Sequence, residues 1–227
     1  MRTKTLLIAA AALAVGIISS EAQVYSQNVV GYVNISVTNN GFTLINTPLD
    51  FDGTGTNNTV ANVIGTNLPY NSIVEIWNGT VFSLNSFSSK TKTWSTPNAL
   101  LNPGLGYFIK NPSNYVVNLT IVGTVLQGNL TNTVIDTTGQ YSLLGYMVPI
   151  AGRIATDLGY VPSPGDKVET WNQTLNSGVG GYNIFNYVGK TKTWSPSEPS
   201  VDVGQGFFIV STNTSATLNT NFTVPHP

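Results

Sequence analysis

The sequence predicts an all-β protein of two similar tandem modules, each a β-sandwich or a small barrel, with only a few short helical turns. The hexapeptide KTKTWS at 90–95 returns unchanged at 190–195, and the register holds without a gap on both sides. Self-similarity at a fixed offset indicates a repeated structural unit. Throughout the chain, short apolar runs are separated by Gly, Pro and Asn–Thr clusters, which is typical of strands joined by turns.

The N-terminal residues have the features of an export signal. A basic start precedes an apolar run over 6–18, and small residues follow at Ser20 and Ala22. Secretory signal peptides have this order, and the run is shorter than the ~20 apolar residues of a membrane span. We therefore predict a signal peptide over 1–22, no membrane span in the mature chain, and an extracellular or cell-surface location.

Residues 23–28 form an uncharged arm that runs without a turn signal into the first module. Such an arm either extends a strand of its own module or adds to a sheet edge of another subunit, where backbone hydrogen bonds supply affinity. The second alternative predicts self-assembly into filaments, because a head-to-tail contact stays open unless its rotation closes it.

We expect the first module over 29–120 and the second over 121–227, with no Ser-, Gly- or Pro-rich linker between them. Each copy contains the same series: an opening Val-Gly-x-Val, an aromatic strand, a Val-Glu-x-Trp-Asn strand, a second aromatic strand, the Lys-Thr-Lys-Thr-Trp turn and a Gly-x-Gly strand. These begin at 30, 42, 74, 82, 90 and 104 in the first copy, and at 122, 141, 168, 182, 190 and 204 in the second.

Local signals add detail to this series. Asn78-Gly79 indicates a two-residue hairpin, because both residues tolerate a positive φ. Short helical turns are expected near 59–65 and 151–159. The repeated Gly-x-Gly strand predicts that Phe108 and Phe208 are buried.

Composition excludes several classes of function. The chain has 9 Lys+Arg and 10 Asp+Glu, and removal of the signal peptide leaves 7 − 9 = −2. Without a basic patch, nucleic acid is not an expected partner. There is no cysteine, and the single histidine is His226, so neither thiolate nor histidine-rich metal sites are predicted. We predict no enzymatic activity and no cofactor.

The motifs Gly41-Phe42-Thr43-Leu44-Ile45, Trp77-Asn78-Gly79, Trp94-Ser95 and Pro103-Gly104-Leu105-Gly106-Tyr107-Phe108-Ile109 follow one another in the first copy. This order resembles a β-rich module found in tandem in secreted and cell-surface bacterial proteins of mostly unassigned function. The resemblance covers nearly all of the mature chain. It implies a tandem β architecture and transfers no catalytic residues.

Two tryptophans lie two residues after a glutamate: Trp77 after Glu75, and Trp171 after Glu169. In a strand this spacing puts acid and indole on one face. Such a face suits a sugar, whose C–H groups stack on the indole while the acid accepts from hydroxyls. Alternatively, each indole covers the neighbouring hairpin and donates its N–H to a loop carbonyl.

The other two tryptophans, Trp94 and Trp194, end the repeated Lys-Thr-Lys-Thr turn. Lys90, Lys92 and Trp94 would share one face of an extended segment and could contact an acidic glycan. Alternatively, the lysines form a solvated edge that discourages pairing between sheets.

Two further groups of acidic residues could form sites. Asp50 and Asp52 lie in an oxygen-rich stretch that suits calcium, but no bidentate Glu follows and the second copy has no counterpart, so no metal site is predicted. Glu75 with Glu169 could serve a glycoside hydrolase, which needs two acids within ~5–10 Å.

The sequence thus favours a secreted, non-enzymatic surface, matrix or adhesion protein built from a duplicated β module, with glycans or other surface proteins as partners. The alternative is a carbohydrate-binding module that uses exposed tryptophans. A carboxylate-dependent glycoside hydrolase is a further alternative.

Overall fold

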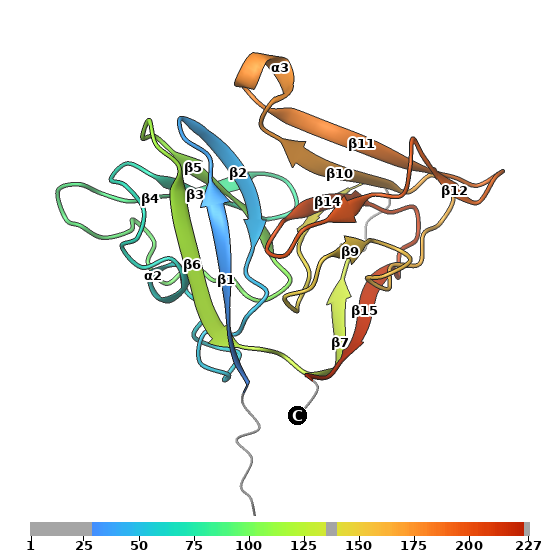
Figure 1. The fold of residues 1–227 in the computed structure, drawn as a ribbon, viewed down its shortest axis with the longest axis horizontal. Coiled ribbons are helices and arrows are strands. Elements are labelled where there is room, and N and C mark those ends of the chain that lie inside the picture. The colour runs from blue at the N-terminus through green and yellow to red at the C-terminus, as the bar shows by residue number, and fades with distance from the viewer. Residues whose placement is uncertain (1–28, 135–139, 225–227) are drawn as a thin grey trace, which may run out of the picture.

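The computed structural model describes residues 29–134 and 140–224. The predicted signal peptide over 1–22, the arm over 23–28 and His226 lie outside these ranges. The described chain is mostly β-structure, in several antiparallel sheets with no closed barrel (Figure 1). The all-β prediction is therefore confirmed, and the small-barrel alternative is wrong because the sheets remain open. No described helix is long and apolar enough to cross a membrane.

Residues 29–124, here called the first half, form two sheets. One pairs β1 (Val30–Val37) with β6 (Val117–Thr124). The other has the order β2 (Gly41–Asn46), β5 (Gly106–Asn111), β3 (Ile73–Trp77) and β4 (Phe82–Ser86). One helical turn, α2 (Val60–Val63), begins where the Thr59 side chain accepts a hydrogen bond from the Asn62 backbone N–H, which caps the helix.

The described residues of 125–224, here called the second half, form three sheets. One pairs β7 (Gly128–Thr133) with β15 (Thr217–Phe222), and a short one pairs β9 (Gly152–Arg153) with β13 (Ser200–Val201). The largest has the order β12 (Thr193–Ser195), β11 (Gly181–Val188), β10 (Lys167–Asn172), β14 (Phe207–Val210) and β8 (Tyr141–Leu144).

The larger sheets of the two halves have matching strand orders. Numbered along the chain, β2, β3, β4 and β5 lie in the order 1-4-2-3, and so do β8, β10, β11 and β14. The registers match as well: Glu75 lies between Leu84 and Phe108, and Glu169 lies between Ile184 and Phe208.

The predicted module boundary falls inside a strand. β6 runs through 120 and 121 to Thr124, and Gly123 pairs with Gly31 of β1. Residues 122–125 were expected to open the second module, but 122–124 complete the first two-stranded sheet. The reason is the alternation of β6, whose buried residues continue from Leu119 through Ile121 to Gly123.

The local signals were confirmed in part. A hairpin joins β3 to β4, but its last strand pair is Trp77 with Phe82, so four residues separate the strands. Within this loop the Asn78 N–H donates to Val81 O (3.1 Å). The helical turn near 59–65 is α2. Residues 151–159 contain β9 and turns instead of a helix. A helical turn that was not predicted, α3 (Leu175–Gly178), includes three residues with positive φ, one of them a glycine.

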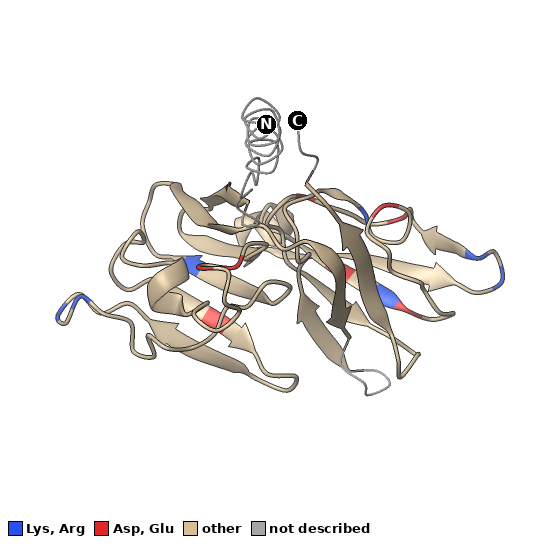
Figure 2. Cartoon of the chain, turned by 90° about the horizontal axis from the view of Figure 1, so that it is seen from below, with Lys and Arg blue, Asp and Glu red and all other residues tan. Residues whose placement is uncertain are grey.

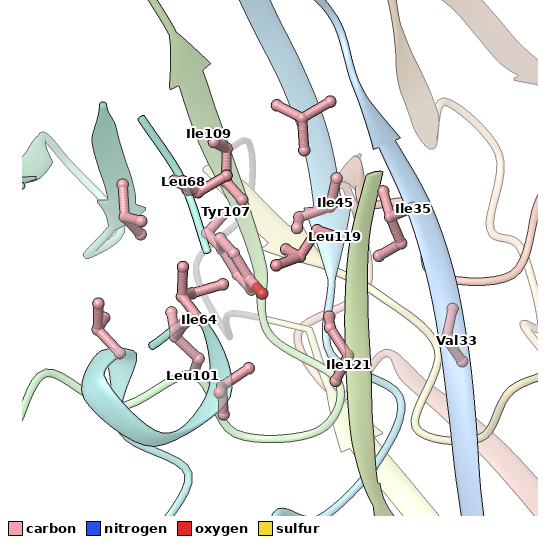
Figure 3. Packing of buried hydrophobic residues seen from close by; sticks show 14 of the residues in the cluster. Val33, Ile35, Ile45, Ile64, Leu68, Leu101, Tyr107, Ile109, Leu119 and Ile121 are labelled. Carbon is pink, nitrogen blue, oxygen red and sulfur yellow. The ribbon is translucent and has the colours of Figure 1, made fainter. Parts of the chain in front are cut away.

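Each half has its own apolar core between its two main sheets. Figure 3 shows the first core, where Val33 and Ile35 of β1 and Leu119 and Ile121 of β6 face Tyr107 and Ile109 of β5. The side chains of α2 close one side. The second core has the same layout, with Leu218 of β15 packed among Val168, Phe207 and Ile209.

Candidate functional site

A third apolar cluster, here called the seam, joins the two halves. Its centre is formed by four buried side chains from β2, β5, β8 and β14: Leu44, Phe108, Leu143 and Phe208. Alternation along β5 explains its origin, because Tyr107 and Ile109 enter the first core while Phe108 points to the opposite face. Phe108 and Phe208 are 4% and 5% exposed, which confirms the prediction that both are buried.

Three rings meet each of these phenylalanines edge-on. The ring centroid of Phe108 lies 6.1, 5.8 and 5.2 Å from those of Phe42, Phe82 and Trp171. The rings around Phe208 are the corresponding ones, at 5.6, 5.8 and 6.2 Å: Tyr141, Tyr182 and Trp77. In each set two rings come from the same half and the tryptophan comes from the other half. Edge-to-face pairs contribute ~0.5–1.5 kcal/mol each beyond the burial of area.

The two seam tryptophans also exchange hydrogen bonds. Trp77 Nε1 donates to Tyr141 O in the second half (2.8 Å), and Trp171 Nε1 donates to Phe42 O in the first half (2.9 Å). Phe42 and Tyr141 begin equivalent aromatic strands. Each indole N–H therefore bonds to a carbonyl, as the alternative to sugar binding predicted. The carbonyl, however, belongs to a strand of the other half and not to a loop of the neighbouring hairpin.

Backbone bonds cross the seam in the same reciprocal way. The Asn46 N–H donates to Gly204 O (2.8 Å), and the Gly145 N–H donates to Gly104 O (2.9 Å). The approach is close at Gly145, where a Cβ atom would lie 2.1 Å from Cβ of Asn46. A side chain at Gly145 would force the halves apart.

The two glutamates of the seam have different surroundings. Glu169 is buried, forms an ion pair with Lys167 (2.8 Å) and accepts a hydrogen bond from Tyr141 Oη (3.1 Å). Glu75 is half-buried, and burial raises its pKa while the charge of Lys110 partly opposes that change. A carboxyl with a raised pKa can hold a proton closer to neutral pH.

Two hollows open beside these acids. One, of about 360 Å³, is lined by Glu169 and the rings of Trp77, Phe82, Tyr141, Tyr182 and Phe208. The other, of about 150 Å³, is lined by Glu75 and the rings of Phe42, Phe82, Phe108, Trp171 and Tyr182. Burial and repulsion from Glu169 and Glu75 raise the pKa of Tyr182 to about 12. The hollows offer ring faces and a single acid each, which suits contact with a C–H-rich ring.

Trp94 and Trp194 are buried in the cores, at 4% and 8% exposure, so they lack the exposure expected of a carbohydrate-binding face. Trp94 stacks on Phe87 with a centroid distance of 5.0 Å, and its Nε1 donates to Gly65 O (2.7 Å). Trp194 packs against Tyr187 at 5.3 Å. Its buried Nε1 has no acceptor within the described ranges.

The lysines before these tryptophans lie on hairpin turns, not on an extended face shared with the indole, which corrects that expectation. Lys92 has φ of 57°, and its N–H donates to Ser88 O (2.9 Å). Lys192 has φ of 54°, and its N–H donates to Val188 O (2.8 Å). The positive φ reverses the chain, so the lysines stay exposed while the indole turns inward.

The acidic loop after β2 uses its carboxylates internally. Asp50 Oδ2 accepts from the Gly55 N–H (2.7 Å), while Asp52 accepts from Asn57 Nδ2 (2.5 Å) and from the N–H and hydroxyl of Thr54. The bonds from Asn57 and Thr54 lower the pKa of Asp52. Within residues 29–134 and 140–224, no three His, Cys, Asp or Glu side chains gather as metal ligands would.

Sequence reasoning did not identify the rings that complete the seam: Phe42, Phe82, Tyr141 and Tyr182. A signal existed, because each occupies the same place in both copies of the series. It also missed two hollows that adjoin Lys92 and Lys192. Their walls combine equivalent residues, such as Phe87 and Tyr187, with residues from loops that differ between the copies, so only the structure could reveal them.

Comparison of the chain with protein-family models, with curated proteins and with solved structures gave no match.

Proposed function

We propose that this chain is an exported, non-enzymatic surface, matrix or adhesion protein built from two copies of one β module. The repeated hexapeptide and the common 1-4-2-3 strand order support the duplication. The matching registers around Glu75 and Glu169 support it further. The signal-like N-terminal sequence supports export.

The reciprocal seam is the observation that carries this proposal. The two indoles that could have formed a reactive site instead attach one half to the other, and one of the acids, Glu169, is paired within its own half. Trp77 and Trp171 each donate across the seam, and Glu169 is neutralised by Lys167. Side chains used in this way stabilise a two-module scaffold, as a structural or adhesive protein requires.

Export and surface retention test the proposal. The full chain and a version that starts at Gln23 are expressed in a bacterial host, and cytoplasm, envelope and medium are separated. We expect the full chain to lose residues 1–22, as mass spectrometry of the new N-terminus would show, and to remain with the envelope or an extracellular matrix. An uncleaved full chain in the cytoplasm would contradict the proposal.

Carbohydrate recognition at the seam is a second candidate, favoured by the hollow of about 360 Å³ that surrounds Glu169 with aromatic rings. Titration of the mature chain with neutral oligosaccharides, followed by tryptophan fluorescence, tests it. A saturable change that weakens in Tyr182→Phe would support this candidate, and an unchanged spectrum across the panel would eliminate it.

The hydrolase alternative requires two acids in one cleft. Glu75 and Glu169 line adjoining hollows that share Phe82 and Tyr182, but Glu169 is held in an ion pair with Lys167, which favours the non-enzymatic proposal. Incubation with a polysaccharide panel should release no new reducing ends. Turnover that disappears in both Glu75→Gln and Glu169→Gln would replace our proposal with a hydrolase.

A further inference from the structure

We propose that the two lysine turns are twin binding sites for an acidic polysaccharide, one at each end of the molecule. Each tip site, as we call it, consists of the turn at 90–95 or 190–195 together with the hollow that its second lysine adjoins. This inference rests on the proposed role outside the cell and names the partner class for that role.

The first argument is identity at exposed positions. Between 81–109 and 181–209, the identical pairs outside the turns are two glycines, a phenylalanine and an isoleucine, all buried. The turns differ from this pattern, because five of their six identical residues are exposed: the two lysines, the two threonines and the serine. Packing explains the buried identities, and a hydrogen bond between the two threonine hydroxyls of each turn (2.8 Å) explains the threonines, but neither requires the lysines.

The second argument concerns the backbone of the turns. Lys92 and Lys192 both have left-handed φ values, of 57° and 54°. This region favours Gly or Asn, so local conformation alone would not select lysine there. Strain retained at equivalent positions indicates that the side chain itself is needed.

The third argument is the distribution of charge. In the described ranges, Arg153 pairs with Asp157 (3.1 Å), Lys167 pairs with Glu169, and the Lys110 ammonium lies 5.5 Å from the centre of the Phe42 ring. No described carboxylate forms an ion pair with any of the four tip lysines. Figure 2 shows these cations on two loops at opposite ends of the molecule. The chain is weakly acidic overall, so each tip is a local positive site suited to an anion.

The fourth argument is the hollow beside each turn. Lys92 adjoins a hollow of about 530 Å³ whose other walls include Leu68, Tyr70, Phe87 and Tyr115. Tyr70 is 45% exposed and stacks on Phe87 with a centroid distance of 5.3 Å, so it presents a ring at the surface. Aromatic walls with a few polar groups are typical of ligand sites.

The second hollow, of about 370 Å³, combines Lys192 with the half-buried ring of Tyr187, and the buried rings of Tyr160 and Trp194 lie behind it. Glu198 also lines it, but its carboxylate accepts from the backbone N–H groups of Ala155 and Thr156 (2.9 and 2.7 Å). Because this acid lies only in the second hollow, we expect the first tip site to bind an anionic ligand more tightly.

Ring faces next to a cation indicate a sugar that carries a carboxylate or sulfate. Its C–H face packs on the aromatic wall while the acid group meets the lysine. An anionic lipid surface needs the charge but not the aromatic hollow. Two such sites at opposite ends can hold two strands of one polymer network, and this bivalency raises apparent affinity without new contacts.

Binding to polygalacturonate, with its fully methyl-esterified form as the uncharged match, tests the inference. The mature wild-type chain should bind the acid form, and its apparent affinity should fall steeply between about 50 and about 500 mM NaCl. Removing one tip with Lys90→Gln and Lys92→Asn should lower apparent affinity about tenfold or more and abolish polymer cross-linking in light scattering. Adding Lys190→Gln and Lys192→Asn should abolish binding.

Two controls separate the tip sites from general charge and from folding. Lys110→Gln removes the same single charge as Lys92→Asn alone and should leave affinity unchanged. Asn tolerates a positive φ, so Lys92→Asn and Lys192→Asn should unfold at the same temperature as the wild type or a higher one. Equal losses in the control and tip variants, or equal binding to the esterified polymer, would overturn the inference.

Other outcomes distinguish this inference from the proposed function. Wild-type binding to phosphatidylglycerol vesicles but not to polygalacturonate would replace the polysaccharide with a membrane. A chain that is exported and retained at the surface, yet binds polygalacturonate no better than the four-lysine variant, would refute the tip sites and leave the proposed function standing. A chain that binds polygalacturonate but is not exported would refute the proposed role.

Discussion

Replacing Phe108 with Ala tests the seam most directly. The side chain is 4% exposed, and its ring meets one ring from β2, one from β4 and Trp171 of the other half. The substitution removes the buried ring and leaves a cavity, and changes of this kind cost ~3–5 kcal/mol. Three edge-to-face contacts disappear with the ring, so we expect a value within that range.

Urea denaturation followed by tryptophan fluorescence measures the loss. Trp77 and Trp171 report on the seam, while Trp94 and Trp194 report on the two cores. Leu84→Ala is a suitable control. Leu84 lies on β4 and pairs with Glu75 of β3, but its side chain is 59% exposed. We expect the control to change the free energy of unfolding by no more than ~0.5 kcal/mol.

The reciprocal geometry extends the prediction to Phe208→Ala, which should cost about as much. The two substitutions share one cluster, so the double variant should depart from additivity by ~0.5–3 kcal/mol. A loss below ~1 kcal/mol for Phe108→Ala would place its ring at the surface and refute the seam.

Three further predictions follow from individual contacts. Trp171→Phe keeps a ring but removes the donor to Phe42 O, and urea denaturation should show a loss of ~1–3 kcal/mol because that carbonyl loses its partner. Glu75→Gln should raise the melting temperature at pH 7, because burial raises the pKa of Glu75 in the folded state. Wild-type stability therefore falls as pH rises from the pKa of the unfolded state through the pKa of the folded state. Below about pH 4 the acid is protonated in both states, so the melting temperatures of wild type and variant should converge. Asp166→Asn should cost ~2–3 kcal/mol in the same urea assay. The fully buried side chain of Asp166 accepts hydrogen bonds from Tyr160 Oη (2.6 Å), the Ser163 N–H and the Thr212 N–H (both 2.7 Å). Asn offers one acceptor oxygen in place of two, so it cannot keep all of these bonds.

The sequence was sufficient to predict features that a local structural rule determines. The repeated Gly-x-Gly run correctly predicted that Phe108 and Phe208 are buried, although alternation puts Tyr107 and Phe207 into the cores and it is the seam that buries Phe108 and Phe208. The acid and indole of Glu75 and Trp77 were also correctly assigned to one strand. The placement of Glu75 and Trp77 depends only on a period of two residues, which short-range geometry imposes.

Features that depend on long-range placement were not predictable. The offset of one hundred shows that two segments are equivalent, but not where one lies relative to the other, so the partners of Trp77 and Trp171 stayed hidden. The prediction of an extended segment at Lys92 was wrong for a local reason. Lysine rarely adopts a positive φ, so the alternation of Lys90, Lys92 and Trp94 suggested an extended face that the backbone does not form.

The seam and the strand order together determine where the tips lie. β2 and β8 are edge strands, and isolated bridges from Ile45 to Gln205 and from Leu105 to Leu144 connect these edges across the seam. The 1-4-2-3 order places β4 and β11 on the far side of each sheet, and the lysine turns follow these strands. A reciprocal contact at one edge therefore directs the two turns away from each other, as Figures 1 and 2 both show. Two-ended binding is thus a geometric consequence of how the halves meet, and a single module with the same turn would have only one end to offer.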